Sequence, residues 1–507
     1  MSRIFPVAFL STVLVMAFTL LTANLIAQEP VEESSNRQLA EVGMDTSAQD
    51  QLLLPALNTK MSVNIPVHSK NIEYATFNFD LLEQMASGDE FEIELANKRY
   101  TGVVEKSKTQ KYGCTVNGVL SDTPGSLFTI SMVDDAAAGT FFIPDKGMIR
   151  LRYGGPEGLH YLYEVTAIKG IHCAVEGREP EEGEDIEREG DTLPELVESK
   201  TDRGDGDESF DRQSGCSAPP TTFDIMLVYT PAARSAAGGV SQIEAECANA
   251  VAVTEMTYAN SGLPIRTNLV FLAEVAYNEN GTFDDHLNRL RDPGDGILDQ
   301  INGQRNAAGA DFVGLVVNAN QFCGIGDCFS NASTAMSVNN WECMADNYTL
   351  AHEIGHNMGL NHDPGNGFCS SLPNAFGHVT NSFRTVMGTG TRQRIGFYSN
   401  PNRSFNGVAT GTSSRNNVAT IASRQNFVES FRQSRINVFV DFGANGSENG
   451  SFQNPFDTVL EGVNQTLADP VADIPELTIK AGSTSETLTI SKPMIIRACG
   501  GTVTIGN

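Results

Sequence analysis

The pattern of hydrophobic and polar positions divides the chain into stretches of different character. Residues 1–27 are apolar almost throughout, whereas residues 28–58 are polar and acidic without periodicity, which predicts a flexible lead. From residue 59 to residue 175, short runs alternate between apolar and polar positions and are separated by Gly, Pro, Asp and Asn. Alternation with a period of two and frequent turn residues predict an antiparallel all-β domain.

The alternation gives way to an acidic segment, residues 176–215. Charge runs of this kind are usually solvated linkers, and we predict a linker here. Arg203 and Arg212 are candidate processing points within it.

Residues 216–436 combine continuous apolar runs, typical of buried strands, with stretches of helical periodicity. The first strand is expected to be closed by Pro231, and residues 331–338 are expected to form an edge strand that lines a substrate cleft. The predicted elements are strands at 222–230, 265–275, 310–317 and 331–338, and helices at 240–259, 284–308 and 415–432. The last helix should turn one set of side chains inward, namely Val418, Ile421, Phe427, Val428 and Phe431.

Residues 437–507 contain short strand-like runs and one helix-like stretch. The runs lie at 438–441, 477–480, 486–490, 494–496 and 502–505, and the helix-like stretch at 457–467. This succession resembles the cap and first coils of a right-handed parallel β-helix. Such coils normally need at least three repeats to bury their faces, so a truncated β-helix, an accessory domain and a different small β fold all stay open.

The chemistry is concentrated at residues 349–363, which read TLAHEIGHNMGLNHD. On a helix, positions i and i+4 share a face, so His352 and His356 point in the same direction. Gly359 can adopt positive φ, so the helix can end there and the chain can return His362 as a third ligand. Three neutral imidazoles at about 2.0–2.1 Å leave a fourth position on Zn²⁺ open for water, as in catalytic sites. Glu353 lies beside the first histidine without binding the metal.

A bare His-Glu-x-x-His pattern is weak, but the extended pattern also fixes a glycine, a third histidine and their offsets. In this form it resembles the metzincin metallopeptidases. The resemblance implies a methionine turn beneath the zinc, and Met387 fits this position. Asp363, directly after the third histidine, resembles the reprolysin (adamalysin) branch. Residues 388–390 read Gly-Thr-Gly, without the tyrosine that astacins and serralysins usually carry there.

The resemblance implies an α/β catalytic domain, with a mixed twisted sheet and a zinc-site helix, that hydrolyses peptide bonds in proteins. His352, His356 and His362 would bind one catalytic zinc ion, and Glu353 would act as general base on a metal-activated water. The all-β region resembles the propeptide of secreted reprolysin-like proteases, which implies a zymogen. The alternative is a secreted adhesion or binding protein in which the zinc site is structural or inactive. Glu353 argues against it, because a structural site does not need this carboxylate.

Composition narrows the partners. The chain has 507 residues, which is too long for one ordinary domain, and its net charge of −28 disfavours nucleic acid and anionic membrane surfaces. A positive start, an apolar run and small residues up to Ala27 predict a secretory signal peptide. An uncleaved membrane anchor is the alternative, which the polar residues directly after Ala27 disfavour. We therefore predict a secreted protein, without stable membrane insertion, that acts on proteins or peptides.

Nine cysteines in a secreted chain predict disulfides rather than metal ligands. A disulfide between Cys114 and Cys173 is favoured, and a Cys173 thiolate on the zinc is the alternative. Six further cysteines could form three disulfides whose pairing the sequence does not decide: Cys216, Cys247, Cys323, Cys328, Cys343 and Cys369. Cys499 then has no partner. Five further histidines are expected to be structural or surface groups: His68, His160, His172, His286 and His378. Cleavage preference, Ca²⁺ binding and oligomeric state stay undecided.

Overall fold

The computed structural model describes residues 50–55, 65–155, 159–168, 173, 216–367, 369–468, 470 and 472–506. The predicted signal peptide, the acidic linker, Arg203, Arg212 and His172 lie outside these residues. Among the described helices, none combines the length and the apolar character that crossing a membrane requires.

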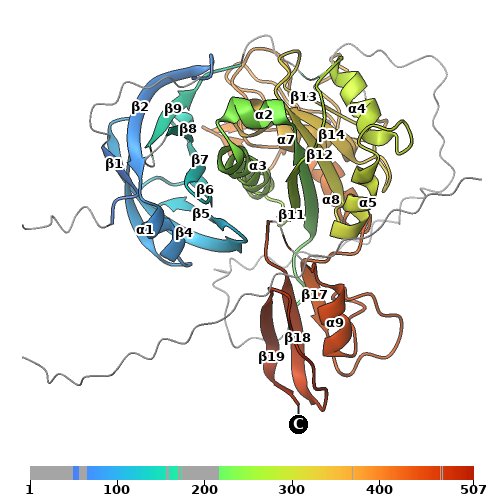
Figure 1. Cartoon of the computed structure of the whole chain (residues 1–507). Coiled ribbons are helices and arrows are strands. Elements are labelled where there is room, and N and C mark those ends of the chain that lie inside the picture. Colours follow the sequence, from blue (N-terminus) through green and yellow to red (C-terminus); the bar gives the residue numbers. More distant parts are fainter. Residues whose placement is uncertain are drawn as a thin grey trace, which may run out of the picture. The chain divides into compact units, whose positions relative to one another are not determined.

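The first part of the chain forms one nine-stranded sheet, as the period-two pattern predicts (Figure 1). All its neighbouring strands pair antiparallel in the order β1-β2-β9-β8-β7-β6-β5-β4-β3. The elements are β1 (Leu53–Pro55), β2 (Ser69–Phe77), α1 (Phe79–Gln84), β3 (Glu90–Leu95), β4 (Lys98–Gln110), β5 (Gly113–Leu120), β6 (Leu127–Val133), β7 (Ala136–Ile143), β8 (Gly147–Gly155) and β9 (Leu159–Val165). We call residues 50–168 the β domain. The prediction of a flexible lead over residues 28–58 is wrong for residues 53–55. These residues form strand β1, whose Leu53 is buried in the core of this domain.

The second part, which we call the α/β domain (residues 216–436), is built on a five-stranded sheet. Its order is β11-β10-β12-β14-β13, and every pair is parallel except β13 with β14. The strands are β10 (Thr222–Tyr229), β11 (Arg266–Glu274), β12 (Phe312–Val317), β13 (Gly324–Gly326) and β14 (Met336–Asn340). The helices are α2 (Pro231–Ala237), α3 (Val240–Ser261), α4 (Phe283–Arg291), α5 (Gln300–Ala308), α6 (Cys343–Asp346), α7 (Thr349–Asn357) and α8 (Asn417–Glu429). A short hairpin, β15 (Ser404–Phe405) and β16 (Val408–Ala409), precedes α8.

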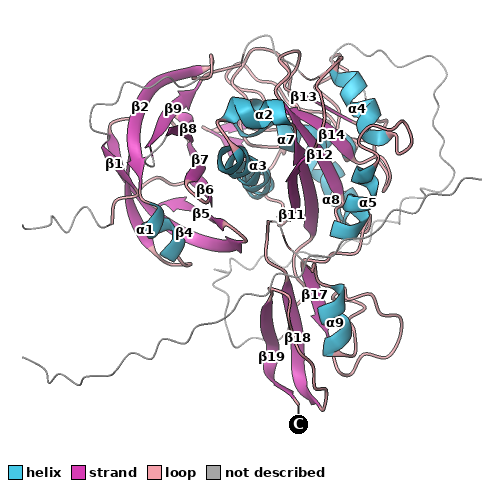
Figure 2. Cartoon of the chain, in the orientation of Figure 1, coloured by secondary structure: helices cyan, strands magenta, loops and turns pink. Residues whose placement is uncertain are grey.

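Helices cover both faces of this sheet, which explains the continuous apolar runs of its strands (Figure 2). Along β10, Ile225 and Leu227 pack with α3, α7 and α8, whereas Met226 and Val228 pack with α4 and α5. Successive side chains of a strand point to opposite faces, so each strand contributes to two apolar cores.

Pro231 closes β10, as predicted, and also begins α2, because Thr230 caps the helix and a proline without an N–H fits its first turn. Two sequence predictions fail in this domain. The edge strand of the sheet is β13 and not residues 331–338, which the sequence could not predict because a three-residue Gly-Ile-Gly strand carries no detectable pattern. Phe427 is 42% exposed although Ile421 and Val428 are buried. A step of one residue turns a helix by about 100°, so Phe427 leaves the inward stripe.

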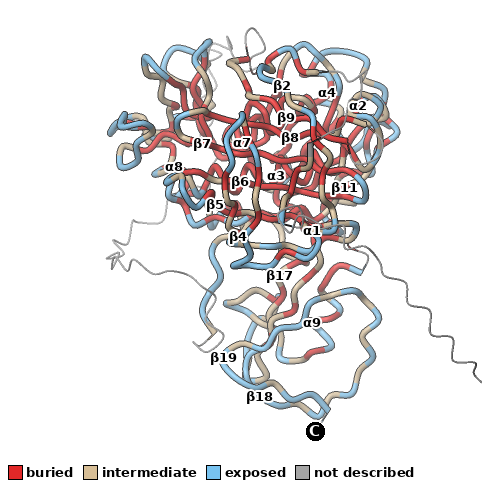
Figure 3. The backbone as a smooth tube through the Cα atoms, turned by 90° about the vertical axis from the view of Figure 1, so that its left-hand side faces the viewer, coloured by how far each residue is buried: buried red, intermediate tan, exposed pale blue. Residues whose placement is uncertain are grey.

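The last part forms a three-stranded parallel sheet of β17 (Asn437–Val440), β18 (Glu476–Thr484) and β19 (Ile495–Ile505), with α9 (Val459–Gln465) between the first two strands. Two predicted strands merge into β19, and residues 486–490 form no strand. The residues of β19 are largely exposed (Figure 3). Parallel pairing suits stacked coils, and assignment to a β-helix stays a prediction.

Candidate metal centre

The motif residues lie on α7 and on the turn that follows it. Tyr348 begins the helix with a positive φ of 53°, and the helix ends just before Gly359, whose φ is 86°. A Cβ at Gly359 would lie 2.6 Å from Phe329 Cδ2, so both the backbone conformation and the close approach require glycine. The chain reverses here, as the sequence predicts, and brings His362 back to the helix.

The structure brings the three histidines together. Each pair of Nε2 atoms among His352, His356 and His362 is separated by 3.1 Å. Two nitrogens bound to one tetrahedral Zn²⁺ at about 2.0–2.1 Å are about 3.3 Å apart, so the spacing fits a bound ion. The rings are almost fully buried, with exposures of 0–1%.

Backbone carbonyls fix the orientation of all three rings. Nδ1 of His352 lies 2.7 Å from Val386 O, Nδ1 of His356 lies 2.9 Å from Leu360 O, and Nδ1 of His362 lies 2.5 Å from Asn366 O. A proton on each Nδ1 satisfies these carbonyls and leaves the Nε2 lone pairs converging on one point. Burial, together with neighbouring positive groups, lowers the pKa of His352 and of His356 well below the ordinary value. Neutral imidazole is the form that binds a metal.

Glu353 lies beside this cluster and is fully buried. Its Oε2 is 3.5 Å from Cys173 Sγ, whereas Oε1 has no hydrogen-bond partner within the described part of the chain. Burial raises the pKa of Glu353 to about 8, although the Cys173 thiol, the Arg394 guanidinium and the Gly326 N–H all favour the charged form. A carboxylate with this pKa can both accept and release a proton near neutral pH.

Two contacts support the cluster from the segment after it. Met387 is fully buried, and its Sδ would lie 2.6 Å from a Cβ added at Gly355, so the methionine packs directly beneath α7. Asp363 Oδ1 accepts hydrogen bonds from Thr389 N at 2.8 Å and from Thr389 Oγ1 at 2.7 Å. These bonds tie the turn of the third histidine to the methionine segment.

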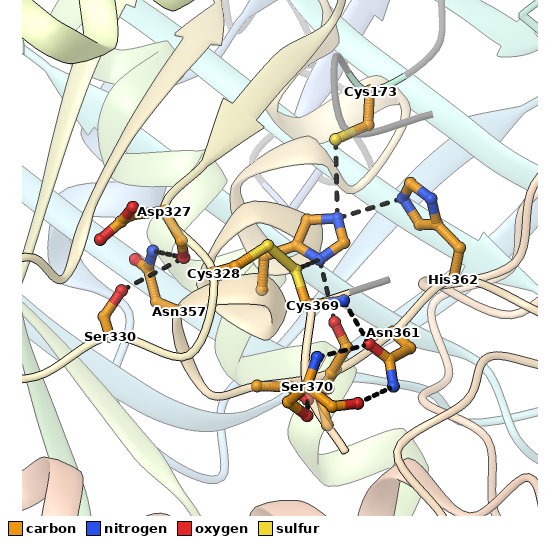
Figure 4. Close-up of a disulfide and its surroundings, with 12 residues drawn as sticks. Cys173, Asp327, Cys328, Ser330, Asn357, Asn361, His362, Cys369 and Ser370 are labelled. Atoms are coloured by element: carbon orange, nitrogen blue, oxygen red, sulfur yellow. Dashed lines mark hydrogen bonds between the residues drawn. A yellow bond between two sulfur atoms is a disulfide. The ribbon is translucent and has the colours of Figure 1, made fainter. Parts of the chain in front are cut away.

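The disulfides differ from the sequence prediction. The bridges are Cys216–Cys499, Cys323–Cys343 and Cys328–Cys369. Cys499 is therefore not left over; Cys247 is instead a buried thiol on α3. The prediction failed because residues 216 and 499 are 283 positions apart and were assigned to separate domains. Figure 4 shows the Cys328–Cys369 bridge. Nδ1 of His356 lies 3.2 Å from Cys369 Sγ.

The favoured Cys114–Cys173 disulfide is wrong, because neither residue is disulfide-bonded. Cys114 Sγ lies 3.8 Å from Leu82 O inside the β domain. Cys173 Sγ lies 3.5 Å from His356 Nε2 and belongs to one group of four metal-ligand atoms with the three histidines. Cys173 also forms a parallel β-bridge with Gly324 on the edge strand β13.

Sequence reasoning missed other residues around the centre. Gly324 and Gly326 place β13 directly against Glu353, since a Cβ on Gly324 would lie 2.5 Å from Glu353 Oε1. Arg394 donates to Asn347 O at 3.0 Å and to Gly388 O at 3.4 Å. Asp346, near the start of α7, binds arginines of the β domain. No local motif marks these positions, because their partners are distant in sequence.

The helix that carries two histidines, the glycine turn to the third and the buried methionine beneath them have the arrangement expected of a metzincin metallopeptidase. Residues 220–399 match the family model described as metallo-peptidase family M12. The resemblance drawn from the motif is therefore confirmed for this part of the chain.

Curated relatives match over part of their length. A protein named peptidyl-Asp metalloendopeptidase from Stenotrophomonas maltophilia is 31% identical over 283 residues, which cover 54% of this chain and 66% of the relative. One with the same name from Xanthomonas campestris is 36% identical over 205 residues, 39% of this chain and 48% of the relative. The chain thus spans less than two thirds of the relatives it matches. Metalloproteinase-II from Bacteroides fragilis aligns with a TM-score of 0.31 at 13% identity, over 58% of this chain and 89% of that one.

Proposed function

We propose that the protein is a secreted zinc endopeptidase, made as a zymogen, that hydrolyses peptide bonds in proteins. The observation that carries the proposal is the convergence of three buried histidine Nε2 atoms, 3.1 Å from one another, beside the buried carboxylate of Glu353. His352, His356 and His362 would hold the ion. Bound Zn²⁺ would supply a Lewis acid that lowers the pKa of water and stabilises negative charge on the substrate carbonyl.

Glu353 then moves the proton. Its Oε1 accepts a proton from the attacking water and passes it to the nitrogen of the departing amine. Gly324 and Gly326 of β13 lie close to the Glu353 side chain, and the Gly326 N–H favours its charged form. Glu353→Gln keeps the shape and removes the base, so turnover should be lost while zinc content is retained. Full turnover by this variant would refute the assignment.

We assign the latency of the uncut protein to the Cys173 thiol. This thiol lies 3.5 Å from both Glu353 Oε2 and His356 Nε2, so it fills the space that a substrate carbonyl needs. It also completes a set of four donors for the ion. The full-length Cys173→Ala variant should therefore hydrolyse peptides without any cut in residues 176–215, whereas wild type should not. Equal latency in both proteins would exclude this role.

The names of the relatives suggest a preference for aspartate next to the cleaved bond. We assign recognition of that carboxylate to Arg394. Its guanidinium is held between Asn347 O, before α7, and Gly388 O, after Met387. It is also close enough to favour the charged form of Glu353. A planar guanidinium binds a carboxylate through two parallel hydrogen bonds.

Two peptides that differ only by Asp or Ala test this preference. In Arg394→Gln, kcat/KM should fall at least about 10-fold for the Asp peptide and stay near wild type for the Ala peptide, because a charge-assisted hydrogen bond contributes about 1.5–3 kcal/mol. Arg394→Lys keeps the charge but loses the planar guanidinium that makes two parallel hydrogen bonds. Its kcat/KM for the Asp peptide should lie between those of wild type and Arg394→Gln. Equal losses on both peptides would assign Arg394 to structure instead.

A further inference from the structure

The β domain binds the α/β domain through two buried arginines of β8. Arg150 and Arg152 are two positions apart, so they point to the same face of the strand. Arg150 pairs with Asp346 at 2.7 Å and with Glu246 at 2.5 Å, and Arg152 pairs with the same two carboxylates at 3.0 and 3.2 Å. The arginine side chains are 0% and 2% exposed.

Asp346 receives further donors from the same domain. His68 Nε2 and Tyr163 OH lie 2.7 and 2.5 Å from its Oδ2. Burial opposes the charge of Asp346, but Arg152 and Arg150 outweigh it and hold the pKa of this carboxyl well below its usual range. The Arg152 guanidinium also lies 4.9 Å from the ring centroid of Trp341, the single tryptophan of the chain. All these donors belong to the β domain, and the two carboxylates to the α/β domain.

The surface that receives these arginines is the polar stripe of α3. Gln242, Glu246 and Asn249 follow one another at i, i+4 and i+7, the spacing of the water-facing side of an amphipathic helix, yet all are buried. Asn249 accepts a hydrogen bond from Thr140 Oγ1 at 2.8 Å and donates to Thr129 O at 3.2 Å.

The same contact extends to the far end of α3, where Glu255 pairs with Lys106 of the β domain at 2.8 Å. Positions 242 and 255 are about 20 Å apart along a helix, so the β domain covers most of α3. The contact also has an apolar part, because Phe142, Met148 and Tyr161 of the β domain belong to one buried cluster with Ala248 and Val251 of α3. Contacts between domains of one chain are usually more polar than obligate interfaces, which suits domains that can separate.

We infer that the stripe of α3, with Glu246 and Asp346, is a docking surface that keeps the β domain bound as a separate chain after the linker is cut. Arg150 and Arg152 provide the affinity of the cut β domain for the α/β domain. Cys173 only blocks the metal centre. Cutting the linker therefore gives a non-covalent complex, and release of the β domain is a later step. The docking surface stands without the proposed function; the separate role of Cys173 rests on it.

The test uses the full chain with a specific protease site inserted among residues 176–211. After cleavage, wild-type fragments should co-elute on gel filtration at micromolar concentration. Arg150→Met/Arg152→Met should separate, with a Kd at least about 100-fold weaker, because truncating one partner of a buried charge pair weakens binding strongly. Trp341 fluorescence reports the separation, because Arg152 stacks on its ring.

Matched variants define the outcomes. Lys70→Met removes an exposed ion pair with Glu164 inside the β domain and should co-elute like wild type. Cys173→Ala should also co-elute, because the thiol is assigned no docking role. If the double variant does not fold, Arg152→Lys keeps the charge and should bind about 10-fold more weakly. Prompt separation of the cut wild type, or unchanged affinity in the arginine variants, overturns the inference. Co-elution of the cut Cys173→Ala fragments without peptidase activity would refute only the proposed function.

Discussion

Gly324 is the position where a single added methyl group would reach the proposed catalytic base. An ideal Cβ there would lie 2.5 Å from Glu353 Oε1, 2.8 Å from Glu353 Cγ and 2.7 Å from Thr349 Cγ2. Gly324 is not among the residues with positive φ, so alanine fits the backbone. Since close carbon–oxygen contacts begin at about 3.3–3.6 Å, the Glu353 carboxylate has to move by about 1 Å.

A displacement of this size should reduce catalysis without removing the metal. Misplacing a reacting group by about 1 Å can cost about 100-fold in rate, which corresponds to about 2.7 kcal/mol of transition-state stabilisation. We therefore expect Gly324→Ala to lower kcat/KM about 100-fold. Zinc content should not change, because none of the three atoms nearest to the added Cβ belongs to a histidine ring.

The assay is hydrolysis of a fluorogenic peptide after the linker is cut and the Cys173 segment is displaced, since Cys173 forms a β-bridge with Gly324 in the structure. Zinc is measured on the same samples. Gly303→Ala is the matched control: Gly303 lies in α5, with nothing within 4 Å of its added Cβ. It should keep full activity and stabilise the helix by about 0.5–1 kcal/mol. Wild-type kcat/KM in Gly324→Ala would refute the reasoning, and loss of zinc would move the effect to the metal site.

Other changes have separate outcomes. His362→Ala should sharply reduce zinc bound after dialysis, and unchanged zinc would exclude the three-histidine site. Because the folded-state pKa of Asp346 is depressed, its contribution to stability is present above the unfolded pKa of about 3.9 and is lost as the pH falls through the lower folded value. The free energy of unfolding, measured with denaturant between pH 2.5 and 5, should fall with decreasing pH in wild type and fall less steeply in Asp346→Asn. Equal pH dependence in the two proteins would contradict this role of Asp346. Cys216→Ser/Cys499→Ser removes a disulfide that closes a loop of 283 residues, which contributes about 5.6 kcal/mol by chain entropy. The C-terminal segment should then unfold at lower denaturant with peptidase activity intact, and an unchanged unfolding midpoint would argue against this role.

The periodicity of apolar residues predicted the β domain and several strands of the α/β domain. The period-two runs gave the antiparallel β domain, and the apolar runs at 222–230 and 310–317 gave the two central strands of the α/β sheet. The spacing from His352 to His362 was informative, because helix geometry and one glycine decide where these rings point.

Long-range pairing could not be predicted. Cys216 meets Cys499 across two predicted domain boundaries, and Cys173 reaches the metal centre instead of Cys114. Arg150 looks like an ordinary solvent-facing position of an alternating strand, yet it is fully buried. Its role depends on a second domain that covers that face of the sheet.

The most direct test of the central claim is zinc-dependent peptide hydrolysis by the full chain after the linker is cut and the Cys173 segment is displaced. Wild type and Glu353→Gln are measured side by side, with a chelator and after zinc is restored. We predict that wild type is active, loses activity to the chelator and regains it with zinc. Glu353→Gln should bind the same amount of zinc and stay inactive. A folded, zinc-loaded and activated wild type without hydrolysis, or equal activity in both proteins, would contradict the assignment.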